Sequence, residues 1–195
     1  MLLFDQEAHA YTLDGRPVPS VTQVLAQLED YSGIPTQVLE RKARLGTAVH
    51  KACELHLADE LDEGSLHPDV APYLDQFRSW LSASRFEPVL SERKVFSKRF
   101  QFAGTLDLFG TMQSRRVLID IKTACNVMPT FGPQTAAYAS ALEECEHLKT
   151  EDRFVLMLTP KRFELVPMKN PADLNVFYAA LTIQQWRLKH GKSAA

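Results

Sequence analysis

The stretch VLIDIKTA, residues 117–124, carries a carboxylate and an ammonium two residues apart. Its alternation of apolar and polar residues predicts a β-strand, and a strand directs Asp120 and Lys122 to the same face. A surface ion pair explains this spacing as readily as a catalytic site does. The residues that surround Asp120 in the fold therefore decide between the two interpretations.

A second carboxylate is expected directly opposite the first. Residues 100–112 predict a preceding strand that contains Asp107. If residues 113–114 form a two-residue hairpin loop, the register places Asp107 opposite Asp120 with their Cβ atoms about 5 Å apart. Like charges in that position destabilise a sheet, whereas a divalent cation between them reverses the sign, and Mg²⁺ prefers oxygen ligands. The hairpin therefore predicts a metal site beside Lys122.

Two expected helices carry further polar pairs. His50 and Glu54 are four residues apart in GTAVHKACE, and Gln134 and Tyr138 are four apart in QTAAYASAL. Residues at this spacing share a helix face and can converge on one point. Taken alone, the first pair is more simply a solvated surface pair, and the second is more simply core packing with a hydrogen bond.

The surrounding elements must position these residues. Residues 4–20 predict a hairpin that turns at Asp14-Gly15, and Ser20 is expected to cap a helix over residues 21–30. Helices are expected at 35–58, 69–83, 134–146 and 171–191, and strands at 88–97, 100–112, 115–123, 153–160 and 163–169.

This order predicts one α/β (α+β) domain over residues 1–195, with a central mixed sheet flanked by helices. An N-terminal hairpin and helix occupy residues 1–33. The core covers residues 34–168 in the order helix, three strands, helix, strand. A C-terminal helix covers residues 169–195.

Composition limits the class of protein. The 195 residues are 45% hydrophobic and 24% charged, with a net charge of −2, as in many globular domains, and this charge disfavours an extended basic surface for nucleic acid. No apolar run approaches the roughly 20 residues that cross a bilayer, and no secretory signal is recognisable, so we expect a cytoplasmic protein that does not bind membranes. Three cysteines without a CxxC pair argue against a cysteine zinc site and against an iron–sulfur cluster.

In their order along the chain, the motifs resemble the RecB-like branch of the PD-(D/E)XK nuclease superfamily. The matching segments are GTAVHKACE, AGTLDLFG, LIDIKTA and QTAAY, and they span residues 46–138. Residues 4–25 are similar to the start of phage and prophage exonucleases of this group, and the motif layout is similar to that of mitochondrial genome maintenance exonuclease. Leu106 stands where the superfamily name expects proline, which this branch replaces with a Gly-x-x-Asp form.

The resemblance implies a restriction-endonuclease-like core and a metal site in its centre. Asp107 and Asp120 would bind Mg²⁺, for which Mn²⁺ would substitute, and the main-chain carbonyl of Ile121 would complete that side. Lys122 would orient the attacking water and stabilise the negative charge that develops on the phosphate.

The flanking helices acquire roles by the same resemblance. His50 would bind the metal or organise the site, and Glu54 would hold a second metal or a metal-bound water. Gln134 and Tyr138 would position DNA and the lysine. Glu92 lies on the strand before the hairpin, where members of the family often carry an acid.

The predicted function is a Mg²⁺- or Mn²⁺-dependent deoxyribonuclease, and the resemblance favours an exonuclease of phage-type or bacterial recombination, replication or repair. DNA is the expected partner, and a single-strand annealing protein is a second candidate. Arg41, Lys42 and Arg44 are candidates for contacts with backbone phosphates, although a solvated basic face is the commoner meaning of such a run. The alternatives are a catalytically silent DNA-binding module of the same fold and a structural protein whose site residues form only ion pairs.

Overall fold

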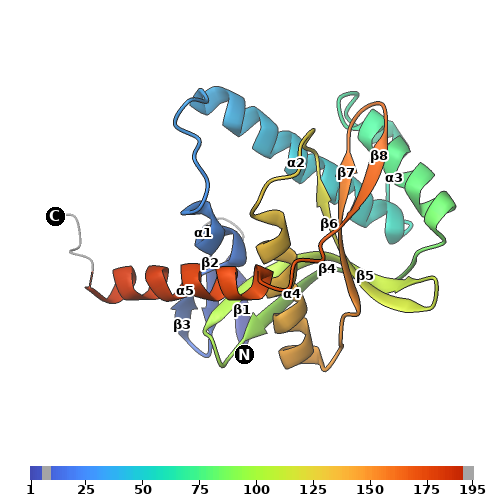
Figure 1. The fold of residues 1–195 in the computed structure, drawn as a ribbon. Coiled ribbons are helices and arrows are strands. Elements are labelled where there is room, and N and C mark those ends of the chain that lie inside the picture. The colour runs from blue at the N-terminus through green and yellow to red at the C-terminus, as the bar shows by residue number, and fades with distance from the viewer. Residues whose placement is uncertain (6–9, 191–195) are drawn as a thin grey trace.

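Five strands form the central sheet of the protein, and three shorter strands form a second sheet near the N-terminus (Figure 1). The computed structural model describes residues 1–5 and 10–190. The central sheet contains, in spatial order, β4 (Glu87–Ser97), β5 (Phe102–Met112), β6 (Arg115–Lys122), β7 (Asp152–Leu158) and β8 (Phe163–Pro167). The small sheet contains β1 (Leu2–Asp5), β2 (Ala10–Leu13) and β3 (Arg16–Val18).

Helices cover both faces of the central sheet, which confirms the predicted α+β architecture. They are α1 (Val21–Ala26), α2 (Thr36–Leu57), α3 (Ala71–Ser84), α4 (Phe131–Glu146) and α5 (Asp173–His190), with a short 3₁₀ turn, η1 (Glu63–Ser65). One face packs Phe109 and Leu118 against α1, α4 and α5, and the other packs Leu108 and Ile119 against α2 and α3. The alternation of side chains along β5 and β6 therefore divides the core into two layers.

The sheet is mixed because one pair of neighbouring strands is parallel. β6 and β7 run parallel and are connected through α4, whereas the other neighbouring strands are antiparallel. A parallel pair needs such a crossover, since its second strand must start again at the same end of the sheet. Helix α4 therefore follows the carboxyl end of β6 and lines the same cavity as Asp107, Asp120 and Lys122 of the hairpin.

The predicted β5–β6 hairpin is confirmed, including its register. Gln113 and Ser114 form the two-residue loop, and both have positive φ, at 52° and 64°. Such a turn matches the right-handed twist of the flanking strands. Met112 pairs with Arg115, and the ladder continues to Leu108 and Ile119.

The N-terminal predictions also hold, with one difference in length. Asp14 and Gly15 form the turn between β2 and β3, and Ser20 caps α1 in a capping box with Gln23. The prediction extended this helix to Asp30, but α1 ends at Ala26. Residues 6–9 of the predicted hairpin lie outside the described residues.

The starts of the other helices differ from the prediction by one to three residues. Helix α4 begins at Phe131 rather than Gln134, because Pro133 is tolerated in a first helical turn. Helix α3 begins at Ala71 rather than Asp69, with Val70 at its N-cap.

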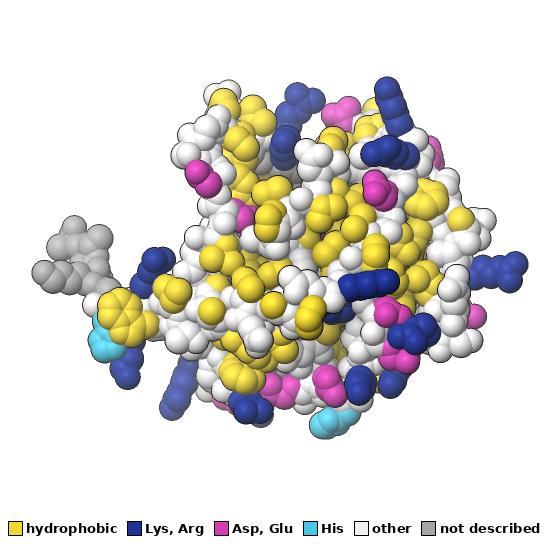
Figure 2. Space-filling view, viewed as in Figure 1, with side chains coloured by type: hydrophobic (Ala, Val, Ile, Leu, Met, Phe, Trp, Pro, Cys, Tyr) yellow, Lys and Arg dark blue, Asp and Glu magenta, His cyan; other side chains and the backbone are white. Residues whose placement is uncertain are grey.

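Helix α5 leaves part of its apolar surface uncovered. Figure 2 shows hydrophobic side chains along this helix. Trp186 and Leu188 of α5 are 63% and 70% exposed. In the described part of the chain, no helix is long and apolar enough to cross a membrane.

Candidate functional site

Most of the predicted site residues line one cavity of about 650 Å³. The cavity lies beside the first half of β5 and the end of β6, between α2 and α4. The small sheet borders it with Phe4 and Tyr11. The predicted residues that it brings together are His50, Glu54, Asp107, Asp120, Lys122, Gln134 and Tyr138. Segments separated by up to 88 positions in the sequence therefore meet at one place, as the sequence predicted.

The two aspartates lie just beyond the last paired residues of the β5–β6 hairpin, at the end away from its loop. The β5–β6 ladder ends at the pair Leu108–Ile119, one position before Asp107 and Asp120. The main-chain N–H of Ile121 donates instead to Asp107 Oδ2, at 2.6 Å. The side chain of Asp107 thus replaces a main-chain partner just beyond the end of the ladder.

His50 connects α2 to both strands of the hairpin. Its Nε2 lies 2.9 Å from the main-chain oxygen of Ile121, so Nε2–H donates to this carbonyl. The other ring nitrogen, Nδ1, points toward carboxylates and lies 3.3 Å from Asp107 Oδ1 and 3.6 Å from Glu92 Oε1. A hydrogen bond to one ring nitrogen fixes which nitrogen is free to bind a metal. The contact with Ile121 therefore leaves Nδ1 as the candidate ligand atom.

The charges in this cluster are strongly coupled. Burial lowers the pKa of His50, but the carboxylates of Asp107 and Glu92 outweigh burial and raise that pKa to about 10. Burial raises the pKa of Asp107, yet the charges of His50 and Lys122 bring it below its ordinary value. A proton on His50 Nδ1 thus lies between the ring and the carboxylates of Asp107 and Glu92, and a metal ion bound by these three residues would replace it.

Glu92 enters the cluster through an unusual backbone conformation. It lies between Ser91, which pairs with Leu108, and Arg93, which pairs with Leu106, so its register position is opposite Asp107. Its φ is 47°, a left-handed conformation that non-glycine residues rarely adopt and that costs on the order of 1–3 kcal/mol. This local kink interrupts the β4–β5 ladder and accompanies the approach of the Glu92 carboxylate to His50.

Glu92 is the residue that sequence reasoning assigned least firmly. The sequence placed it on the strand before the hairpin but gave no register for that strand against β5. The missing signal was the short connection at residues 98–101 between β4 and β5. Counting back across this connection places Glu92 opposite Asp107.

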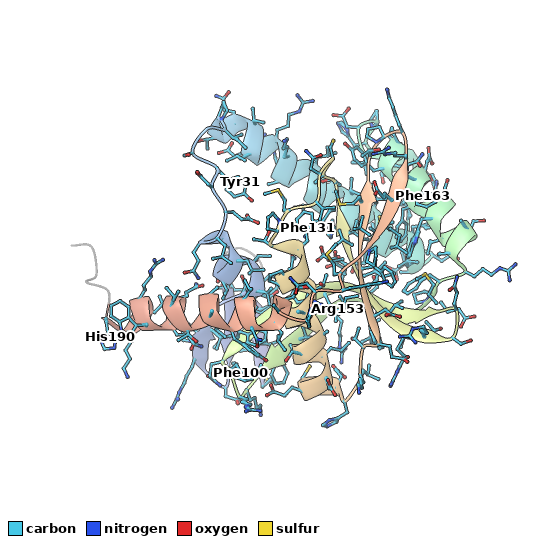
Figure 3. The ribbon with its side chains drawn as sticks, viewed as in Figure 1. Tyr31, Phe100, Phe131, Arg153, Phe163 and His190 are labelled. Carbon is cyan, nitrogen blue, oxygen red and sulfur yellow. The ribbon has the colours of Figure 1, made fainter. Side chains whose placement is uncertain are left out.

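Asp120 and Lys122 form the second half of the site. Lys122 Nζ lies 2.8 Å from Asp120 Oδ2 and 5.2 Å from the centre of the Phe131 ring. Phe131, labelled in Figure 3, lies at the start of α4. Burial raises the pKa of Asp120 to about 6, although the charge of Lys122 opposes this shift. Burial lowers the pKa of Lys122, but Asp120 and Asp107 raise it above its ordinary value. The lysine is therefore charged at neutral pH.

Helix α4 presents a pair of hydrogen-bonding groups to the cavity. Gln134 Nε2 donates to the hydroxyl oxygen of Tyr138, at 3.2 Å, and both residues are largely buried. Tyr138 packs against Gly104 of β5, where an added Cβ would lie 2.6 Å from Tyr138 Cε1. The glycine in the AGTLDLFG motif thus allows the tyrosine to reach the site.

The Gly104→Ala variant is expected to unfold with a free energy about 1–3 kcal/mol lower than that of the wild type, because the methyl group overpacks a buried contact. Urea denaturation measures this difference. Gly33→Ala is the matched control, since its Cβ would meet no atom within 4 Å. Equal stability of the two variants would contradict the assigned role of Gly104.

The structure separates four predicted residues from the cluster. Glu54 lines the cavity, but its carboxylate binds Lys51 of the same helix, at 2.7 Å. Arg41 and Arg44 line a different cavity, and Lys42 is exposed beside them. The helical spacing relative to His50 places Arg41 and Arg44 on another face of α2, and the structure shows that a second cavity lies on that face.

The cluster that the structure assembles has donors suited to a divalent cation. His50, Glu92 and Asp107 each offer one ligand atom, and these atoms lie within 4.8 Å of one another. Two carboxylates suit Mg²⁺ and Mn²⁺, and an imidazole nitrogen favours the transition metal of the two. The chemistry of the residues therefore fits Mn²⁺ or Mg²⁺, with Glu92 present in the group and Asp120 adjacent to it.

Comparison with known proteins adds little to this geometry. No family model and no curated protein matches the chain. Among solved structures, the chain is similar to one described as "Crystal structure of SSO0001", with 14% sequence identity and a TM-score of 0.39. That match covers 88% of this chain and 85% of the other.

Proposed function

We propose that this protein is a divalent-metal-dependent nuclease that hydrolyses phosphodiester bonds in DNA. The observation that carries the proposal is that one cavity contains both a group of candidate metal ligands and a partly buried lysine. His50, Glu92 and Asp107 form a cluster with the donors of a metal site, and Lys122 holds a positive charge beside Asp120. The Asp120 side chain is 1% exposed and that of Asp107 is 9% exposed. This burial argues against the interpretation of these carboxylates as members of surface ion pairs.

Each residue has a separate task in this mechanism. A bound cation would supply Lewis acidity to the phosphate and activate a water molecule. The ammonium of Lys122 stabilises the negative charge that grows on the phosphate oxygens, and its position is fixed by Asp120 and the Phe131 ring. Asp120, with a pKa of about 6, is largely ionised at neutral pH and can accept a proton from water.

The remaining groups position the substrate. Gln134 and Tyr138 offer an amide and a hydroxyl at the α4 side of the cavity, where they can hydrogen-bond to phosphate or sugar oxygens. An exonuclease is the form of the enzyme that we favour, because residues 4–25 resemble the start of phage and prophage exonucleases. A single-strand annealing protein is the partner proposed on the same basis.

The test is digestion of end-labelled DNA by the purified protein. Linear and circular substrates, each single- and double-stranded, are incubated with Mn²⁺, with Mg²⁺ or with EDTA. We expect cleavage of linear DNA with either metal, faster with Mn²⁺ because of the histidine ligand, and none with EDTA. Binding of DNA without cleavage under every metal condition would instead identify a catalytically silent module.

A further inference from the structure

A second cavity, of about 590 Å³, lies on the other side of α2 from the metal cluster. Residues 67–73 at the start of α3 and Pro160 in the β7–β8 turn complete it. Helix α2 contributes Arg41, Arg44, Leu45 and Ala48. These positions recur at the spacing of one helix face, whereas His50, six residues after Arg44, points to a different face. The helix therefore separates two cavities of similar size.

The second cavity carries two arginines on its α2 side. Arg41 and Arg44 lie one turn apart, and among the described residues neither forms an ion pair. Other arginines of the protein are paired, as Arg93 is with Glu146 and Arg153 is with Asp173. Two guanidinium groups at this spacing can bind the oxygens of one phosphate group.

A histidine adds a further donor to the lining. His67 Nδ1 accepts the main-chain N–H of Asp69, at 3.1 Å, so the proton of the neutral ring lies on Nε2 and is free to be donated. Asp69 contributes the carboxylate that lines this cavity. Its negative charge repels phosphate, so the arginine end of the cavity is the place for an anion.

The remaining wall is apolar and contains an aromatic ring. Tyr73 is half-buried, Val70 is 4% exposed, and Leu45 and Pro160 lie beside them in the lining. Aromatic side chains stack on nucleobases without regard to their sequence, because every base has a π face. One cavity thus combines phosphate-binding cations with a surface for a base.

We propose that this second cavity binds one nucleotide, with Arg41 and Arg44 on the phosphate and Tyr73 against the base. Its volume lies within the roughly 300–1,000 Å³ typical of small-molecule sites. The nucleotide is either a free mononucleotide or one unit of a DNA strand. Arg44 and His50 are separated by about 9 Å along the helix axis, so a strand that crosses α2 can reach both cavities. Only this second source rests on the proposed nuclease function.

The test is calorimetric titration of the full chain in EDTA, which keeps any nuclease silent. The ligands are 5′-dTMP, thymidine and the hexanucleotide (dT)₆. We expect dTMP to bind at least tenfold more tightly than thymidine, since the phosphate meets both arginines. Arg44→Gln and Tyr73→Leu are each expected to weaken dTMP binding at least tenfold. Lys149→Gln is the matched control, because Lys149 is exposed on the loop after α4 and lines neither cavity. It is expected to bind dTMP as the wild type does.

The outcomes separate the two sources and the two proposals. Equal affinity for dTMP and (dT)₆ identifies a free mononucleotide, and affinity at least tenfold higher for (dT)₆ identifies a strand. No binding of dTMP or of (dT)₆ by the wild type, or equal weakening by Lys149→Gln and Arg44→Gln, overturns the site. Circular dichroism melting of each variant shows that it is folded. Digestion of DNA by a wild type that fails to bind dTMP would leave the nuclease proposal intact and refute the nucleotide site. Binding of dTMP without digestion of DNA would support the nucleotide site and refute the nuclease proposal.

Discussion

Replacing Lys122 with methionine is expected to lower the rate of Mn²⁺-dependent DNA cleavage by about 100- to 1,000-fold, the usual effect of removing one electrostatic contact to a transition state. Methionine keeps the length of the side chain and its contact with Phe131 but removes the ammonium. Lys122 is not among the ligand atoms of the His50 cluster, so the affinity for Mn²⁺ should stay within about threefold of the wild type. Single-turnover cleavage at saturating Mn²⁺ and calorimetric titration of the metal measure the two quantities.

The loss of Lys122 leaves Asp120 buried without its cation, and the fold must be shown to tolerate this. We expect Asp120 to become protonated, because burial already raises its pKa to about 6 in the presence of the lysine. The double variant Lys122→Met/Asp120→Asn, which has no buried charge at this position, controls for stability. Lys149→Met, on the exposed loop after α4, controls for the loss of a positive charge. Cleavage at the wild-type rate by Lys122→Met would refute the proposed mechanism.

Replacing Glu92 with glutamine is expected to weaken Mn²⁺ binding by on the order of 100-fold, because a neutral amide replaces a charged ligand of the His50–Glu92–Asp107 cluster. Cleavage should fall at low Mn²⁺ and recover in part as the metal concentration rises. Glutamine has the same backbone preferences and nearly the same shape, so the strained φ of 47° is unchanged. Calorimetry with Mn²⁺ and a metal titration of the cleavage rate measure both effects.

Glu54→Gln provides the contrast within the same cavity. In the structure the Glu54 carboxylate binds Lys51, and it lies outside the metal-ligating group. We therefore expect its Mn²⁺ affinity to remain within about threefold of the wild type. Stronger loss of Mn²⁺ affinity in Glu54→Gln than in Glu92→Gln would show that the family role implied for Glu54 is correct and that the cluster is misassigned.

The hairpin register could be predicted because a local rule governs it. A two-residue loop leaves one way to pair the flanking strands, and this pairing brought Asp107 beside Asp120. The helix spacing of His50 and of Gln134 with Tyr138 similarly fixed which residues share a face. The order of elements could be predicted from the change of hydrophobic period along the chain. The observed helix ends differ from the predicted ones by a few residues.

The tertiary structure alone decided how these local pieces meet. Glu92 became a member of the cluster because the β4–β5 register and a left-handed φ bring its carboxylate to His50. Asp107 accepts a hydrogen bond from the Ile121 N–H. His50 donates to the main-chain carbonyl of Ile121, which the family resemblance assigned to the metal. Such choices depend on distances between strands and helices that sequence spacing does not contain.

The sequence by itself therefore determined the residue types of the candidate site, their order and the face on which each one lies, because strand and helix periodicities are local properties. Only the tertiary structure determined which carboxylates surround His50. It also showed that the arginines of α2 belong to a second cavity, since the packing of α3 and the β7–β8 turn against that helix is a long-range property of the chain.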